Sequence, residues 1–165
     1  MKIWNIDENK FTLKTTYSDH NYAITALDAT AEHIISGDAK ATIIIHEVSD
    51  GNITKVKQSD QHQDVQVIRI SSDGKTCAVG FNFGIIYLYT ISTATCSGKL
   101  RGHDGDIQSF LWLHNKLIST AKDRTIKLWS IADSKCRQTL KLPKASGYKS
   151  KRLRLKLDYS FMLRL

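Results

Sequence analysis

The stretch GHDGDIQSFLWLHNKLISTAKDRTIKLWSI, residues 102–131, decides the fold. It holds three short runs rich in Ile, Leu and Thr, which turn-forming residues separate. Such runs are typical of β-strands, and comparable ones occur earlier in the chain at HIISGD, ATIIIHEV, VQVIRIS, TCAVGF and GIIYLYTI. No helical period is sustained, and the chain has a single proline. We therefore expect an all-β protein.

The strand pattern repeats along the chain. Four segments, KIWNI, IIHEV, YLYTI and KLWSI, align on positions that are 42, 43 and 40 residues apart: Trp4, His46, Tyr89 and Trp129. A second marker precedes each complete unit: Asp19-His20, Asp60-Gln61 or Gly102-His103. Apolar residues stand four and seven positions after the second residue of each marker: Ile24 and Leu27, Val65 and Ile68, Ile107 and Phe110. A period of roughly 40–45 residues is typical of four-stranded propeller blades.

The third unit resembles the WD40-repeat family, because it matches the family pattern GH…S…D…W almost position for position. The resemblance implies a blade of four antiparallel strands and a buried hydrogen-bond chain of four side chains: His103, Ser119, Asp123 and Trp129. A buried carboxylate needs donors, and a buried indole N–H needs an acceptor. We therefore expect these four residues to have a structural role and no catalytic one.

The first two units depart from this pattern. Lys40 and His46 stand in the first unit where Asp123 and Trp129 stand in the third. In the second unit, Gln61, Phe83 and Tyr89 occupy the His, Asp and Trp positions. We expect these two blades to depend on strand packing instead of a polar chain.

The repeats predict a partial WD40 β-propeller of about three and a half four-stranded antiparallel blades. Residues 1–17 form the C-terminal half of an incomplete blade, and complete blades follow at 18–58, 59–100 and 101–141, the last being the most regular. Since a propeller ring usually needs at least four blades, such an arc leaves open strand edges. Either the chain is part of a larger propeller, or another chain completes the ring.

The net charge of +8 is concentrated in a tail, residues 142–165 with the adjoining Lys141. Residues 1–140 have a net charge of +1, whereas residues 141–165 carry eight basic residues and one acid, Asp158. The tail has three interpretations: a truncated strand of the next blade, a basic arm that contacts RNA or an acidic partner, or an aberrant terminus. The sequence leaves the three open.

Composition limits the other classes of protein. No apolar run approaches the roughly 18 residues of a membrane span, and the N-terminus lacks the apolar region of a secretory signal. We expect a cytoplasmic or nuclear location, or both, and no membrane partner. The three cysteines lack metal-site spacing, and the sequence contains none of the nucleophile, phosphate-loop or zinc-protease motifs. We expect no enzyme activity, no metal and no cofactor.

Within the WD40 family, three ordered stretches resemble the gem-associated (gemin) WD-repeat proteins of the survival-of-motor-neuron complex. They are HIISGDAKATIIIHEV, TCAVGFNFGIIYLYTI and the segment from LRGHDGDIQSFLW to TLKLPKASGYKSKR, which together cover about residues 30–152. The resemblance implies a subunit that recognises small nuclear RNA for spliceosomal particle assembly, with protein partners of the same complex. The alternative is a WD40 protein-interaction scaffold without an RNA role. No cap-binding residue carries over from the resemblance.

A binding face, if this chain contributes to one, is expected in the loops that precede each first strand and in the turns between second and third strands. These loops line the narrow end of a propeller. The candidate residues combine aromatic side chains, cations and carboxylates: Tyr22, Lys40, Phe83, Asp104, Asp106, Lys122 and Arg124. Aromatic rings stack on bases, and cations pair with phosphates.

Overall fold

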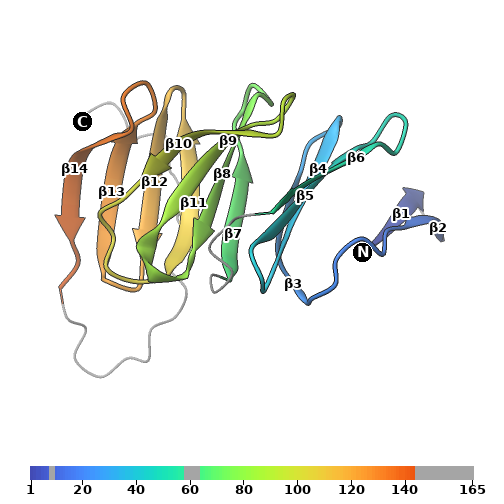
Figure 1. Ribbon diagram of the computed structural model, residues 1–165, viewed down its shortest axis with the longest axis horizontal. Coiled ribbons are helices and arrows are strands. Elements are labelled where there is room, and N and C mark those ends of the chain that lie inside the picture. The colour runs from blue at the N-terminus through green and yellow to red at the C-terminus, as the bar shows by residue number, and fades with distance from the viewer. Residues whose placement is uncertain (8–9, 58–63, 144–165) are drawn as a thin grey trace.

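The computed structural model describes residues 1–7, 10–57 and 64–143, so most of the basic tail lies outside the described residues. The described part is all-β apart from one short 3₁₀ turn, η1 (Asn82–Gly84), as expected from the sequence. Its strands form one two-stranded and three four-stranded antiparallel sheets (Figure 1). The two-stranded sheet consists of β1 (Lys2–Asp7) and β2 (Lys10–Thr16).

The three four-stranded sheets are successive blades, each with its strands in chain order. The first blade has β3 (Ile24–Ala29), β4 (His33–Asp38), β5 (Thr42–Glu47) and β6 (Ile53–Lys57). The second has β7 (Val65–Ile70), β8 (Thr76–Phe81), β9 (Ile86–Thr90) and β10 (Thr95–Leu100). The third has β11 (Ile107–Leu113), β12 (Lys116–Ala121), β13 (Thr125–Ser130) and β14 (Lys135–Lys141).

The pairing of β1 with β2 shares a register irregularity with the pairing of the third and fourth strands of the third blade. A register shift between Leu128 and Trp129 marks the pairing of β13 with β14. The same irregularity occurs between Ile3 and Trp4 in the pairing of β1 with β2. The aligned aromatic positions Trp4 and Trp129 therefore occupy equivalent places in their hairpins.

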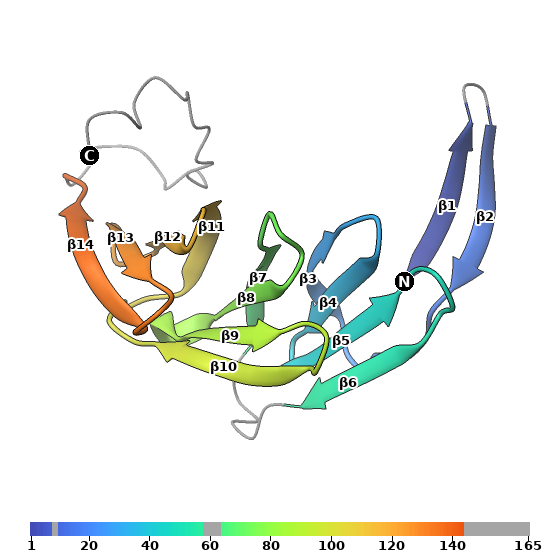
Figure 2. The ribbon, with the colours of Figure 1, turned by 90° about the horizontal axis from the view of Figure 1, so that it is seen from above.

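The blades follow one another around an open arc, with β1–β2 at one end and β14 at the other (Figure 2). The first strands of the second and third blades pack against the preceding blade, because β7 contacts β3 and β4, and β11 contacts β7 and β8. This arrangement confirms the partial propeller that the repeat period predicts.

Two apolar cores lie between the blades, and alternation along the second blade assigns side chains to each. On β8, Cys77, Val79 and Phe81 belong to the core shared with the first blade. Ala78 on the same strand belongs to the core shared with the third blade. Successive side chains of a strand point to opposite faces, so a middle blade is apolar on both. This explains why TCAVGF reads as a continuous apolar run.

The turn between the second and third strands has a left-handed residue at the same position in every blade. These residues are Ala41 (φ 59°), Gly84 (φ 76°) and Arg124 (φ 63°). Glycine adopts this conformation without cost, whereas alanine and arginine do not. Gly84 is also required sterically, since a Cβ atom there would lie 2.1 Å from the carbonyl oxygen of His103. The left-handed residue thus fixes the backbone path of turns that contain candidate binding residues.

Candidate functional site

The structure brings together the four side chains of the polar chain in the third blade. His103 Nδ1 lies 2.8 Å from Asp123 Oδ2, and His103 Nε2 lies 2.7 Å from Ser119 Oγ. The indole Nε1 of Trp129 donates to the same serine oxygen at 2.7 Å. Since the carboxylate accepts from Nδ1, the serine hydroxyl donates to Nε2, and every polar atom of the chain has a partner. The chain joins the loop before β11 to β12 and β13.

Electrostatics match a structural role for this chain. Burial raises the pKa of the Asp123 carboxyl, but hydrogen bonds from the Asp104 amide, His103 and Thr125 outweigh that effect and bring its pKa to about 2. Burial lowers the pKa of His103, although Asp123 opposes the shift. The pair is therefore an ionised carboxylate with a neutral imidazole that is already fully hydrogen-bonded. Ser119 is fully buried and His103 is only 5% exposed, so a ligand has little access to either side chain.

The expectation that the first blade lacks a polar chain is wrong. His20 Nδ1 lies 3.0 Å from Asp38 Oδ2, and His20 Nε2 lies 2.8 Å from Ser36 Oγ. Asp38 also accepts the backbone amides of Lys40 and Thr42, each at 2.9 Å. The carboxylate comes from the end of β4, two residues before Lys40, and it still reaches both the histidine and the turn amides. The repeats align Lys40 with Asp123, so the sequence comparison did not indicate that Asp38 takes the role of Asp123.

His46 does not join the polar chain of the first blade. It occupies the Trp129 position and is buried, yet neither ring nitrogen has a hydrogen-bond partner among the described residues. Its ring lies against Tyr17, with centroids 4.4 Å apart. Burial lowers the pKa of His46, with Asp19 opposing and His20 reinforcing the shift. A buried histidine without partners destabilises the blade that contains it.

The second blade has apolar residues where the others have the polar chain. Val79 occupies the serine position. Tyr89, at the Trp position, is buried, and its hydroxyl has no partner within residues 1–7, 10–57 and 64–143. Burial raises the pKa of this hydroxyl. Gln61, at the histidine position, lies outside the described residues. Strand packing accounts for the part of this blade that the structure describes.

Three of the candidate binding residues form one cluster at the loop end of the second and third blades. The Asp106 carboxylate accepts the Phe83 amide at 3.3 Å and the Lys122 ammonium at 2.6 Å. Hydrogen bonding to Lys122 lowers the pKa of Asp106. Phe83 itself is 69% exposed and has a φ angle of 60°, which is rare for a bulky residue. Asp106 thus bonds the backbone of a residue whose aromatic side chain lies in solvent.

The other four candidates lie beside this cluster or in the first blade. The Asp104 amide donates to Asp123 at 3.0 Å, and Arg124 is exposed on the turn after Asp123. Tyr22 is 54% exposed, and Lys40 is exposed on the turn after β4. The structure therefore places all four in loops, as expected, and the backbone amides of Asp104 and Lys40 bond to the polar chains of their own blades.

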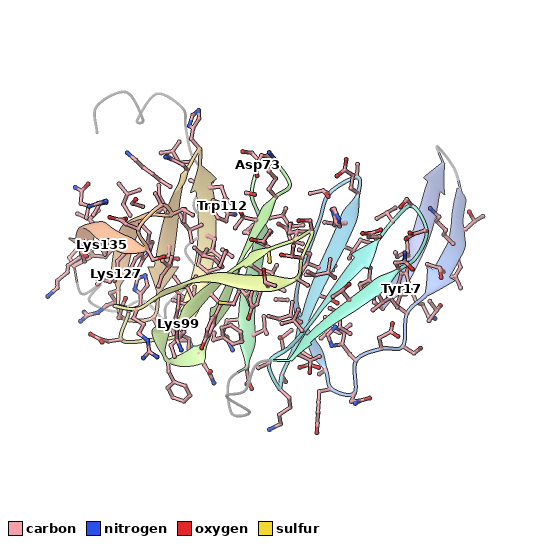
Figure 3. The ribbon with its side chains drawn as sticks, turned by 45° about the horizontal axis from the view of Figure 1, so that its top comes forward. Tyr17, Asp73, Lys99, Trp112, Lys127 and Lys135 are labelled. Carbon is pink, nitrogen blue, oxygen red and sulfur yellow. The ribbon has the colours of Figure 1, made fainter. Side chains whose placement is uncertain are left out.

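A basic hollow that the sequence did not predict lies next to Arg124. It has a volume of about 250 Å³, and its lining includes three cations, Arg124, Lys127 and Lys141, and two carboxylates, Asp104 and Asp123. Lys127 donates to Thr139 Oγ1 at 2.9 Å (Lys127 and Lys135 are labelled in Figure 3). Alternation along β13 places Lys127 on the same face as Trp129. A charge count alone could not have located the hollow.

Trp112 joins the inner strands of neighbouring blades. Its Nε1 donates to the carbonyl of Arg69 on β7 at 3.0 Å, and its ring packs against the core between the second and third blades (Figure 3). On the other side of β7, Asp28 accepts the Ile70 amide at 2.8 Å and the Arg69 guanidinium at 3.2 Å. These bonds link β3, β7 and β11, so Trp112 is a packing residue.

Within the described ranges, no three or more His, Cys, Asp or Glu side chains are grouped as metal ligands. No helix of that part of the chain is long and apolar enough to cross a membrane. Cys77, Cys96 and Cys136 are free thiols. Burial raises the pKa of the Cys77 thiol to about 12.

Comparisons with known proteins agree with this geometry. The family model described as WD domain, G-beta repeat matches residues 94–130. The chain is 26% identical over 140 residues to the periodic tryptophan protein 2 homolog of Caenorhabditis elegans, covering 81% of this chain and 15% of that protein. It is 34% identical over 83 residues to WD repeat-containing protein 1 of Xenopus tropicalis, covering 47% and 14%. A crystal structure of RRP9 WD40 repeats matches with a TM-score of 0.70 and 26% identity, covering 76% of this chain and 40% of that one.

Together these matches support the WD40-repeat family for this chain, with a fold that is typical of non-enzymatic interaction scaffolds. They give no support specific to the gem-associated branch. The chain spans 15%, 12% and 27% of the first three relatives' lengths, so it corresponds to a minor part of each.

Proposed function

We propose that the chain is part of a non-enzymatic WD40 scaffold that binds protein partners through the loop cluster of Phe83, Asp106 and Lys122. The observation that carries this proposal is the exposure of Phe83. Phe83 is 69% exposed and has a positive φ angle, so most of its side chain lies outside the core, and Asp106 accepts its backbone amide. Strained, exposed residues concentrate at binding sites. Aromatic anchors of this kind dominate the energetics of protein interfaces.

The polar chains support the scaffold role because they use the paired histidines and aspartates for hydrogen bonds inside the blades. Hydrogen bonds within the blades occupy His103 with Asp123 and His20 with Asp38. Three cations of the loop end, Lys40, Lys122 and Arg124, are exposed, so a partner can reach them. A rigid propeller arc with exposed loops supplies the pre-organisation that a binding surface needs.

Site-specific photocrosslinking tests this proposal. A benzophenone amino acid replaces Phe83 in one version of the protein and Leu140, which is 56% exposed on β14, in the matched control. We expect adducts in cells from position 83 that resist ribonuclease, and few from position 140. Equal adduct patterns at the two positions would refute the loop cluster as the binding surface.

We propose, as a second candidate, that the scaffold contacts small nuclear RNA during particle assembly, as the gem-associated resemblance implies. The specific observation in its favour is the basic hollow, where Arg124, Lys127 and Lys141 outnumber the carboxylates. One relative, pre-mRNA-processing factor 19 of rice, carries an RNA-related name, at 21% identity over 136 residues. A cytoplasmic or nuclear location, or both, and survival-of-motor-neuron-type partners belong to this second proposal.

Binding of capped small nuclear RNA tests the RNA role. We expect affinity to fall with salt and to fall further when Lys127 and Lys141 are both changed to Gln. The matched control changes Lys75 and Lys116, which lie outside the hollow, to Gln. An affinity that is independent of salt, or equal losses in both double variants, would leave only the protein-scaffold role.

A further inference from the structure

The basic hollow of the third blade has no counterpart at the same register in the other two four-stranded blades. Strand pairing places Lys127 of β13 at the position of Tyr87 on β9 and of Ile44 on β5. Ile44 and Tyr87 are 0% and 7% exposed, whereas Lys127 is only half-buried. Of the three four-stranded blades, the third alone therefore has a charged side chain at this position.

The residue across from this position on the fourth strand decides whether the space is filled. In the second blade, Lys99 of β10 lies opposite Tyr87, with its ammonium 4.5 Å from the centre of the ring, and it donates a hydrogen bond to the Tyr87 hydroxyl (Figure 3). In the third blade the residue opposite Lys127 is Thr139, which has a short side chain. The Lys127 ammonium bonds to the Thr139 hydroxyl, and both residues line the hollow.

Gly102 keeps the hollow open on the side of the loop that enters the blade. It lines the hollow with a φ angle of 145°, and a Cβ atom there would lie 3.4 Å from Trp129 Cη2 and 4.0 Å from Lys127 Cε. The corresponding residues of the other two units are Asp19 and Asp60, which both have side chains. The glycine thus leaves space beside the stem of Lys127.

The three cations of the hollow have no acidic partner in the part of the chain that the structure describes. No ion pair joins Arg124, Lys127 or Lys141 to a carboxylate there. Asp123 also lines the hollow, but its two oxygens already accept four hydrogen bonds within the blade. Cations gathered without counter-charge repel one another, so a bound anion would stabilise them.

The charge and size of the hollow suit a phosphate monoester. The phosphate of a phosphorylated serine or threonine has three acceptor oxygens and a charge of about −1.5 to −2 at pH 7. One guanidinium and two ammonium groups line the hollow, and each can donate to such an oxygen. The volume of about 250 Å³ lies below the roughly 300–1,000 Å³ of pockets that enclose a whole ligand, so one side chain with its phosphate fits better.

An RNA strand matches the hollow less well than a phosphorylated peptide does. Single-stranded RNA is held by aromatic rings that stack on its bases, and no aromatic side chain lines the hollow. The Asp104 carboxylate, which also lines it, can accept a backbone amide next to a phosphorylated residue. The same carboxylate would repel the successive phosphates of an RNA strand.

We propose that the basic hollow binds the phosphorylated serine or threonine side chain of a protein partner. Arg124, Lys127 and Lys141 donate to the phosphate oxygens, and Asp104 accepts a backbone amide of the bound peptide. The proposal rests on the protein-scaffold role but uses a surface separate from the loop cluster of Phe83, so either site can fail while the other stands. An RNA strand in the hollow is the competing occupant.

Peptide titration followed by NMR tests the ligand class. The probe is the capped pentapeptide Gly-Ala-phosphoserine-Ala-Gly, added to the isotope-labelled 165-residue chain. The controls are the same peptide with serine, the same peptide with aspartate, and the dinucleotide UpU, which contains a phosphodiester. We expect saturable shifts of the backbone amide signals of Gly102, Asp104 and Arg124 with the phosphopeptide. Each control should bind at least about tenfold more weakly.

Substitutions of Lys127 locate the binding. We expect Lys127→Gln to weaken phosphopeptide binding at least about tenfold, because it removes a charge-assisted hydrogen bond. Lys116→Gln removes the same charge from an exposed residue of β12 outside the hollow and should retain binding. Lys127→Ile is a second variant, since the first blade has Ile44 at this position, and it should keep the dispersed amide spectrum of the folded chain while losing the phosphopeptide.

Three results would overturn the proposal. One is the absence of saturable shifts with the phosphopeptide. Another is binding of equal strength by the aspartate peptide or by the dinucleotide, since the hollow would then hold a carboxylate or RNA. The third is unchanged phosphopeptide affinity in the Lys127 variants, or an equal loss of affinity in the Lys116→Gln chain.

Discussion

Replacing Asp38 by alanine tests the polar chain of the first blade most directly. The carboxylate accepts two backbone amides at 2.9 Å, from Lys40 and Thr42, and lies 3.0 Å from His20 Nδ1. Lys40 is exposed, so water replaces the bond to its amide, whereas Thr42 is 7% exposed and its amide is left without an acceptor. A buried donor without an acceptor costs about 1–3 kcal/mol, and we expect a loss of stability in this range.

Asp123→Ala in the third blade is the matched comparison. Asp123 accepts the Thr125 amide at 2.8 Å and the Asp104 amide at 3.0 Å, and it holds His103 at 2.8 Å. Thr125 is 8% exposed and Asp104 is exposed, so the same reasoning again gives about 1–3 kcal/mol. Lys40→Ala is the control, because the Lys40 side chain is exposed and only its backbone amide bonds to Asp38.

Urea unfolding followed by circular dichroism measures all three variants, and hydrogen exchange shows which blade opens. Exchange is needed because repeat arrays do not always unfold as one unit. We expect Asp38→Ala and Asp123→Ala to lose similar stability, with faster exchange in their own blades, and Lys40→Ala to lose far less. If Lys40→Ala costs as much as Asp38→Ala, the assignment of Asp38 to the chain is wrong.

Other substitutions test the turns, the buried histidine and the acid response. Gly84→Ala should destabilise the chain by about 2 kcal/mol or more in urea unfolding, because its Cβ would meet the His103 carbonyl oxygen at 2.1 Å; an unchanged midpoint would contradict the geometry of η1. Arg124→Gly should raise stability by up to about 1 kcal/mol, because glycine relieves the positive φ of 63°, and a loss would indicate a structural role for the side chain. His46→Phe should stabilise the chain by roughly 1 kcal/mol at pH 7, because it removes two unpartnered ring nitrogens, and the gain should grow as the pH falls below 6.5. The sign follows from a folded pKa below that of the unfolded chain, so that wild type loses stability on acidification, and a gain independent of pH would contradict it. For Asp123 the pKa of about 2 lies below the ordinary 3.8, so wild type should lose stability between pH 4 and pH 2, and the Asp123→Ala chain should lose less over that interval in the same assay.

The fold class could be predicted because it depends on features that one sequence displays. Strand runs, turn residues and a period of 40 to 43 residues predicted the partial propeller, and the observed sheets confirm that class. The pattern of apolar residues four and seven positions after each marker is likewise visible in the sequence. Their burial was not predictable, because Ile24 and Leu27 have the sequence pattern of Ile107 and Phe110 without the neighbouring strand that covers those residues.

The polar chain of the first blade was missed because side-chain reach is not a matter of sequence spacing. Ser119 and Asp123 are four residues apart, whereas Ser36 and Asp38 are only two apart, yet both carboxylates meet a histidine and the amides of the following turn. A strand end and the first residues of a tight turn lie close in space, so a carboxylate from either place can accept the same donors. Asp19-His20 was a visible signal, since a buried histidine at a blade entrance requires an acceptor.

The same reasoning separates the internally bonded parts of the arc from the parts that are exposed to partners. Blades one and three hold their polar groups in internal networks, and blade two replaces its network with apolar packing. What these solutions leave unused is an exposed Phe83 on one side and an uncovered pair, Ile24 and Leu27, on the other. A fold that leaves large apolar side chains in water has stability to gain from association. The exposed loops are therefore where the function of this chain has to be sought.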